Sequence, residues 1–313
     1  MSSGSRKVII AAFFGNLLIA ITKFGAALIT GSSAMVSEGI HSVVDTGNQV
    51  LLLYGLKRAQ KPADENFPFG HGKEIYFWSF IVAILIFAAG AGISAYEGVH
   101  HLLHPRPLVK PFVNYIVLAF AMVFEGIAWM IARRELARSK GDLGYIQAVR
   151  RGKNPTLFVV FFEDSAAMLG LAVAFTGILL GHITGKSYYD SAASIVIALI
   201  LAGTAIWLAY ETKSLLIGES AENETVENIR KLALSFSGIQ TVNEVLTLHM
   251  GPEFILVNMS VDFDDNIPAG DVERILGELD REIKSAHPDV KRVFIEPEPV
   301  DKTINRQETG GGQ

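Results

Sequence analysis

The chain has 313 residues, of which 50% are hydrophobic and only 19% are charged, and its mean hydropathy is +0.34. Soluble domains carry about 25% charged residues, so this composition is typical of a membrane protein. The absence of cysteine excludes disulfides and thiolate metal ligands. The net charge of −5 is modest, and no basic stretch with interleaved aromatic residues predicts a nucleic-acid partner.

Six apolar segments, each close to the roughly 20 residues that cross a bilayer, are predicted to be transmembrane helices. They are Val8–Ile29, Met35–Leu56, Ile75–Ala95, Phe112–Ile131, Leu157–Leu180 and Tyr188–Ala209. From Glu219 onward the chain is more charged and its apolar runs are shorter. We expect a transmembrane domain over residues 1–218, a soluble domain over 219–299 and a disordered, Gly-rich tail over 300–313.

The distribution of Lys and Arg predicts the orientation in the membrane. Basic residues are concentrated at the N-terminus and in the connections 57–73 and 133–153, whereas the other connections carry only Arg106, Lys110 and Lys186. Both termini are therefore expected in the cytoplasm. No cleaved targeting segment is expected, and the short N-terminal stretch before the first helix favours a prokaryotic plasma membrane.

The second segment contains a polar motif, in which His41, Asp45 and Asn48 are spaced i, i+4 and i+7. On a helix these side chains share one face, and an imidazole and a carboxylate so placed can reach one cation. Ionisable groups in the middle of a membrane helix mark an ion or proton path by default. The alternative is a His–Asp pair that satisfies itself within the helix bundle, although this would not explain the carboxylates of a later helix.

That later helix is the fifth segment, where Glu163 and Asp164 lie within an apolar run. Adjacent residues on a helix point about 100° apart, so one carboxylate can face a shared centre while the other faces a neighbouring helix. Glu125 in the fourth segment is a further intramembrane carboxylate, and Lys23 interrupts the first. In the connection before the third segment, Asp64 and His71 are candidates for a second metal site, although the ligand set is incomplete.

The soluble part alternates between two periodicities. A helix is predicted at about 225–235, strands at 241–249 and 254–263, a second helix at 269–286 and a third strand at 290–296. This α-β-β-α-β order predicts a small ferredoxin-like α+β domain with its helices on one face of the sheet.

Together these features resemble the cation diffusion facilitator family of metal/proton antiporters. The resemblance rests on the six segments, on His41 and Asp45 in the second, on the sequence from Phe69 to Lys73 (FGHGK), on the carboxylates of the fifth segment and on the C-terminal pattern. The run 157–170 is most similar to the zinc-transporter branch that includes an animal mitochondrial member.

The resemblance implies a tetrahedral transport site with two ligands from each of the second and fifth helices. Carried over by position, these ligands are His41, Asp45 and Asp164, and the fourth falls at Val160, which cannot bind a metal. Either Glu163 moves in, or Asn48, Asn16 or water completes the shell. A shell richer in oxygen favours manganese or iron over zinc.

Other family sites depart from the pattern in this chain. One histidine of the loop site is replaced by Phe67, so a site built on Asp64 and His71 is expected to be weak or absent. The histidines of the family's cytoplasmic metal cluster match Asn243, Asn258, Glu296 and Glu298. The resemblance implies a homodimer joined through this domain, here without bridging metal.

The sequence therefore predicts a secondary transporter in the lipid bilayer, not an enzyme, that exports Zn²⁺ from the cytoplasm in exchange for protons. His41, Asp45 and Asp164 would bind metal and protons in turn, so that no separate proton carrier or cofactor is needed. Two alternatives stay open. The same fold could carry Mn²⁺, Fe²⁺ or Co²⁺, or the protein could be a membrane scaffold or metal sensor that no longer transports.

Overall fold

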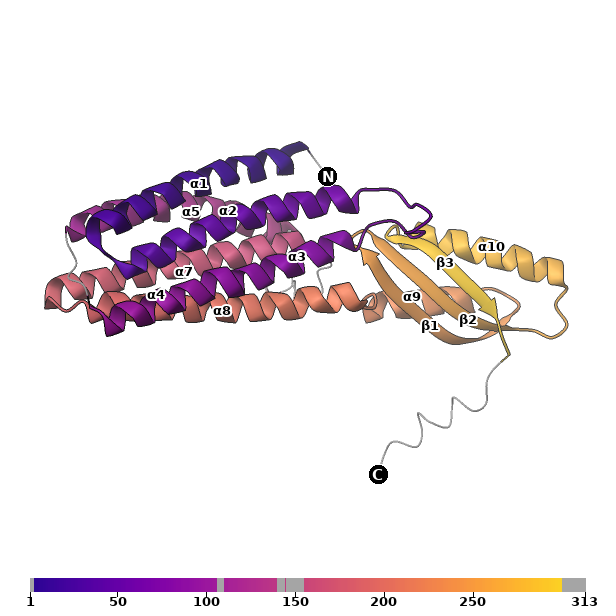
Figure 1. Ribbon diagram of the computed structural model, residues 1–313. Helices are drawn as coiled ribbons and strands as arrows, with labels where there is room; N and C mark the ends of the chain where they lie inside the picture. Colours follow the sequence, from indigo (N-terminus) through magenta and orange to yellow (C-terminus); the bar gives the residue numbers. More distant parts are fainter. Residues whose placement is uncertain (1–2, 106–109, 140–143, 145–154, 300–313) are drawn as a thin grey trace, which may run out of the picture. The chain divides into compact units, whose positions relative to one another are not determined.

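The computed structural model describes residues 3–105, 110–139, 144 and 155–299 (Figure 1). The chain divides into two compact units, one formed by Met1–Pro62 and Lys73–Ser214 and the other by Ala63–Gly72 and Leu215–Gln313. Most of the basic connection 133–153 and the whole predicted tail 300–313 lie outside the described residues.

The first unit consists of long helices that lie side by side (Figure 1). They are α1 (Ser3–Thr30), α2 (Ser33–Ala59), α3 (Glu74–Leu85), the π-helical turn η1 (Ile86–Ala91), α4 (Gly92–Leu103), α5 (Pro111–Ser139), α7 (Pro155–Thr184) and α8 (Tyr188–Ile217). By length and composition, five stretches of the described residues can cross a membrane: Phe13–Thr30, Glu74–Leu103, Pro111–Ala137, Pro155–Thr184 and Tyr188–Ile217. The predicted helical membrane domain is confirmed.

Helix α2 is as long as these spans but less apolar. Its polar side chains are buried, whereas Val43, Val50 and Tyr54 on its other side are about half exposed. This is the reverse of a soluble amphipathic helix, and it suits a helix whose outer side contacts lipid. The polar residues that lower the hydropathy of α2 are therefore those that face the interior of the unit.

The start of α2 is held by a residue of α8. Asp190 accepts hydrogen bonds from the hydroxyl of Ser32 (2.6 Å) and from the backbone N–H and hydroxyl of Ser33 (2.6 and 2.9 Å). Asp190 thereby caps α2, because the first N–H groups of any helix lack partners within the helix.

The second unit has the predicted α-β-β-α-β order. Its elements are α9 (Asn223–Leu234), β1 (Ile239–Gly251), β2 (Phe254–Phe263), α10 (Ala269–Ala286) and β3 (Val290–Pro297). Strands β1 and β2 pair antiparallel, and β2 pairs parallel with β3, so α10 is the crossover between parallel strands. Apolar residues of both helices pack with the strands in one core that includes Ile229, Val257, Leu279 and Ile283, all 0% exposed.

The segment Ala63–Gly72, which connects α2 with α3, belongs to the second unit. A Cβ atom at Gly72 would overlap the backbone carbonyl oxygen of Met250, so only a glycine lets this segment approach β1 so closely. The ring of Phe69 meets that of Phe294 edge to face, with centroids 6.4 Å apart. This connection is thus packed against strands β1 and β3.

Candidate metal site

The interior of the first unit contains a buried polar stripe on α2. Its members recur every three or four residues, as one face of a helix requires, and they are Glu38, His41, Ser42, Asp45, Asn48 and Gln49. Each has 7% or less of its surface exposed. The sequence identified three of these residues as candidate ligands, and α2 brings those three to one face.

His41 and Asp45 lie next to each other near the middle of this stripe. Nδ1 of His41 is 3.4 Å from Oδ1 of Asp45, one turn further along the helix. Among the described residues, neither ring nitrogen of His41 has a hydrogen-bond partner, and Oδ1 of Asp45 has none either. Buried polar atoms are nearly always paired, so these three atoms are suited to receive a ligand.

Contacts from α2 to α7 are made by Glu163. Nδ2 of Asn48 donates a hydrogen bond of 2.6 Å to Oε1 of Glu163. The carboxyl groups of Glu163 and Asp45 also interact electrostatically with each other. Glu163, which the sequence offered as a substitute for the missing fourth ligand, is therefore already in contact with the stripe.

Asp164 is half-buried on the next position of α7 and interacts electrostatically with Glu163 and Glu125. Across the described part of the chain, no three His, Asp or Glu side chains converge closely enough to hold a metal ion. His41 thus contacts Asp45, and Asn48 contacts Glu163, but these side chains do not converge on one point, and Asp164 lies beside Glu163. Their role as a set of ligands remains a prediction.

A second group of charged residues, which sequence reasoning did not connect, lies beside the stripe. Lys23 of α1 is completely buried and binds both Glu38 of α2 and Glu125 of α5. The signal was present in the sequence, because a lysine and two glutamates interrupt apolar segments. Their partnership was not visible, since the pairs are 15 and 102 residues apart.

The loop candidates Asp64 and His71 contact each other in the second unit. Nε2 of His71 lies 2.9 Å from Oδ2 of Asp64, and the Phe67 ring packs against the imidazole with centroids 4.5 Å apart. The hydrogen bond with His71, followed by those from the backbone N–H groups of Phe67 and Asn66, holds the pKa of Asp64 below its usual value. This is a closed loop in which Asp64 fixes the turn.

In the second unit, two of the four residues at the positions of the family's metal cluster, Asn243 and Glu298, are joined by hydrogen bonds. Nδ2 of Asn243 donates hydrogen bonds to Ser260 Oγ (3.1 Å) and to the backbone carbonyl of Glu298 (3.0 Å). The hydroxyl of Ser260 donates to Oε2 of Glu298 at 2.7 Å. These side chains form a hydrogen-bonded group at the end of β3.

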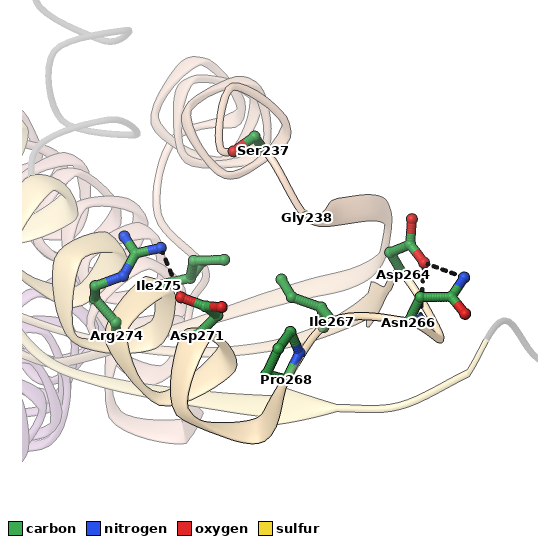
Figure 2. A pocket seen from close by; sticks show the side chains of 9 residues that line it. All are labelled: Ser237, Gly238, Asp264, Asn266, Ile267, Pro268, Asp271, Arg274 and Ile275. Atoms are coloured by element: carbon green, nitrogen blue, oxygen red, sulfur yellow. Dashed lines mark hydrogen bonds and ion pairs between the residues drawn. The ribbon is translucent and has the colours of Figure 1, made fainter.

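This unit also has an open pocket of about 390 Å³ at the start of α10 (Figure 2). Four of its polar residues are paired: Asp264 accepts hydrogen bonds from the backbone and side chain of Asn266, and Arg274 bonds to Asp271. None of the predicted metal ligands lines this pocket.

Comparisons with known proteins extend the resemblance along the chain. The family model described as the cation efflux transmembrane domain matches residues 9–217. The model described as the cation efflux protein, cytoplasmic domain, matches residues 221–300. The two matches cover both the helical and the α+β parts.

The chain is also similar to individual named proteins. The Xenopus laevis protein named proton-coupled zinc antiporter SLC30A9, mitochondrial, is 34% identical over 292 residues, which are 90% of this chain and 52% of that protein. Metal tolerance protein C4 of Arabidopsis thaliana is 29% identical over 83% of this chain and 57% of its own. Manganese efflux system protein MneP of Bacillus subtilis is 24% identical over 94% of this chain and 96% of its own. The chain spans about half the length of the zinc antiporters it matches.

Proposed function

Because this chain belongs to the cation efflux family, also called the cation diffusion facilitator family, we propose that it exports Zn²⁺ from the cytoplasm in exchange for protons. Its relatives are named as transporters, antiporters and efflux proteins, and the chain is a transporter of this family, not an enzyme. The substrate, its path and the coupling to protons are what we propose.

The observation that carries the proposal is the state of His41. Its imidazole is 1% exposed, neither ring nitrogen is hydrogen-bonded to a described residue, and a carboxylate oxygen of Asp45 lies 3.4 Å away. A buried imidazole usually has a partner for at least one nitrogen. A nitrogen donor beside carboxylate oxygens suits zinc. We propose His41, Asp45, Asp164 and Glu163 as ligands, with Glu163 taking the position that Val160 cannot fill.

Asn48 orients the fourth ligand in this proposal. Its amide donates to Oε1 of Glu163, which leaves Oε2 of the same carboxylate for the metal. Hydrogen bonds to a ligand from a neighbouring side chain fix its direction and increase its affinity. Asn48 therefore acts as a support for Glu163, although it remains an alternative ligand itself.

The coupling to protons follows from the contact between Asp45 and Glu163. Two buried carboxylates that interact electrostatically disfavour each other's ionisation, so we propose that this pair holds one proton when no metal is bound. A divalent ion that binds both groups displaces this proton, because metal ligands must be deprotonated. Protons that reach the site from the opposite side then compete with the metal and release it.

Transport requires the site to open to each side of the membrane in turn. We propose that α2 and α7, which carry the ligands, change their position relative to the other helices, as in other secondary transporters with a site near the bilayer midplane. The hydrogen bonds of Asp190 with Ser32 and Ser33 join α8 to the first residues of α2, at the opposite end of α2 from its basic residues Lys57 and Arg58. Those basic residues are expected at the cytoplasmic surface, along with both termini.

Manganese is the alternative substrate that a specific observation favours. The proposed shell has one nitrogen and several carboxylate oxygens, and such shells suit Mn²⁺ and Fe²⁺ better than shells rich in imidazole do. One relative is named for manganese efflux, whereas others are named for zinc. We place zinc first because His41 supplies an imidazole at the centre of the stripe.

We also propose that the protein is a homodimer joined through its second unit. Asn258 on β2 pairs in register with Leu246 on β1 and with Phe294 on β3. The two apolar side chains of this row are about half exposed. Exposed apolar residues on a sheet face favour an interface. The host membrane is proposed to be a prokaryotic plasma membrane, which the match along nearly the whole Bacillus subtilis relative supports.

The direct test uses purified protein in liposomes with an imposed pH gradient. Zn²⁺, Mn²⁺, Fe²⁺ and Co²⁺ are offered singly and in competition. We expect gradient-dependent zinc uptake that exceeds uptake of the other ions. A preference for manganese or iron would correct the substrate, and no movement of any ion would favour a scaffold or sensor.

A further inference from the structure

Lys23 is a completely buried lysine in the middle of the helical unit. Its ammonium nitrogen lies 2.9 Å from each of three oxygens, Oε2 of Glu38, Oγ of Ser42 and Oε1 of Glu125. An ammonium group has three N–H donors, so these bonds use all of them. Three oxygens from two other helices thus surround one cation that is tethered to α1.

This group adjoins the proposed metal site. Glu38 precedes His41 by three residues and Ser42 follows it, so all three lie on the buried stripe of α2. Lys23 interacts electrostatically with His41. Glu125 interacts electrostatically with Asp45 on α2 and with Asp164 on α7.

Each glutamate of this group has one oxygen without a partner. Oε1 of Glu38 and Oε2 of Glu125 are buried, and no described residue forms a hydrogen bond with either. On α7, Gly170 leaves space for Oε1 of Glu38, since a Cβ at that position would overlap it. Two carboxylates, each with one oxygen that no described residue hydrogen-bonds, therefore lie beside the proposed metal site, and both are bound to Lys23.

We propose that Lys23 determines the metal specificity of the transporter by withholding Glu38 and Glu125 from the metal. This inference rests on the proposed function of the neighbouring site. With the lysine in place, the metal meets the ligands His41, Asp45, Glu163 and Asp164. Without it, either glutamate can turn its oxygens toward the metal, and a shell richer in carboxylate favours Mn²⁺ over Zn²⁺. Lys23 is thus a positioning residue that does not touch the metal.

The test compares transport ratios of zinc and manganese in liposomes, with both ions present together. Removing one partner of a buried ion pair is strongly destabilising, so the main variant changes two residues. Lys23→Met with Glu38→Gln leaves Glu125 as a freed carboxylate and keeps one formal negative charge, as in the wild-type group. Lys23→Met with Glu125→Gln does the same for Glu38. The triple variant Lys23→Met, Glu38→Gln, Glu125→Gln has no carboxylate to release.

We expect each double variant to shift the zinc-to-manganese transport ratio toward manganese by about tenfold. This is the lower end of the effect on metal affinity that follows when a residue supporting the ligands is changed. We expect the triple variant to return the ratio to that of the wild type, which a purely structural role would not do. An unchanged ratio in a double variant that transports, or an equal shift in the triple variant, overturns the inference. Failure of both double variants to fold assigns the group a structural role and also overturns it. If the wild type moves no metal, the proposed function itself fails, which is a separate result.

Discussion

Asn48 on α2 donates a hydrogen bond of 2.6 Å to Glu163 on α7, and both side chains are buried. This bond joins the two helices that carry the proposed ligands. It also selects Glu163, and not its neighbour Asp164, as the carboxylate that faces the stripe of α2 in this arrangement.

Replacing Asn48 with Ala is expected to weaken zinc transport, although the four proposed ligands all remain in this variant. Glu163 would lose the bond that orients it, and such changes reduce metal affinity or activity by roughly 10–100-fold. The measurement is the zinc concentration that gives half-maximal uptake. Thr46→Val is the matched control, because among the described residues its hydroxyl bonds to the carbonyl of Ser42 in its own helix and to no other group. Equal zinc dependence in both variants would contradict the role given to Asn48.

Replacing Asp190 with Ala is expected to destabilise the helical unit by roughly 2–4 kcal/mol, because buried hydrogen bonds to a charged acceptor are strong and their donors at Ser32 and Ser33 would lose a partner. Asp190→Asn keeps one acceptor oxygen and should lose less. Thermal unfolding in detergent measures the effect. Thr176→Val, which removes a hydroxyl bonded within α7, serves as the control. A melting temperature for Asp190→Ala equal to that of the control would show that the contact with α2 adds no stability.

Replacing Gly72 with Ala is expected to destabilise the second unit by about 1–3 kcal/mol, as overpacking does, because the added methyl group meets the backbone of Met250. Gly277→Ala provides the opposite case. This glycine lies within α10 with nothing within 4 Å of its Cβ position, so alanine should gain about 0.5–1 kcal/mol. The free energy of unfolding of each variant decides. A Gly72→Ala variant that is as stable as the wild type would mean that the connection 63–72 is not held against β1 as described.

The hydrogen bonds of Asp64 predict a pH dependence. Because His71 and two backbone N–H groups hold the pKa of Asp64 below its usual 3.8, these bonds stabilise the folded chain above that pH. The stabilisation is lost as the pH falls through the lowered pKa and Asp64 becomes protonated. The melting temperature of Asp64→Asn should therefore be below that of the wild type at neutral pH, and the difference should vanish in strong acid. A difference that stays constant down to the lowest pH would exclude this ionisation as its cause.

Much of the fold was predictable because hydropathy and periodicity are local. The helices of the membrane domain follow from apolar stretches, and the strands β1 to β3 follow from short alternating runs. The π-helical turn Ile86–Ala91 was not predictable, since nothing in its apolar sequence distinguishes it from the α-helix on either side. The packing of Ala63–Gly72 with the second unit was missed too, because it depends on contacts far away in the sequence.

The candidate site was predictable where its residues share one helix. The spacing of His41, Asp45 and Asn48 places them on one face whatever the other helices do. Which residue of α7 meets that face depends on the rotation of one helix against another, which spacing alone does not determine. For the same reason the sequence showed a charged Lys23 but not that Glu38 and Glu125 are its partners.

The most direct test of the account measures zinc and proton movements together in liposomes that contain a pH-sensitive dye. In the wild type, zinc added to one side should drive protons to that side as zinc leaves it. Asp45→Asn and Glu163→Gln should abolish both movements, whereas the exposed Glu244→Gln on β1 should leave both unchanged. Exchange of zinc for protons at the wild-type rate in Asp45→Asn would contradict the proposed site.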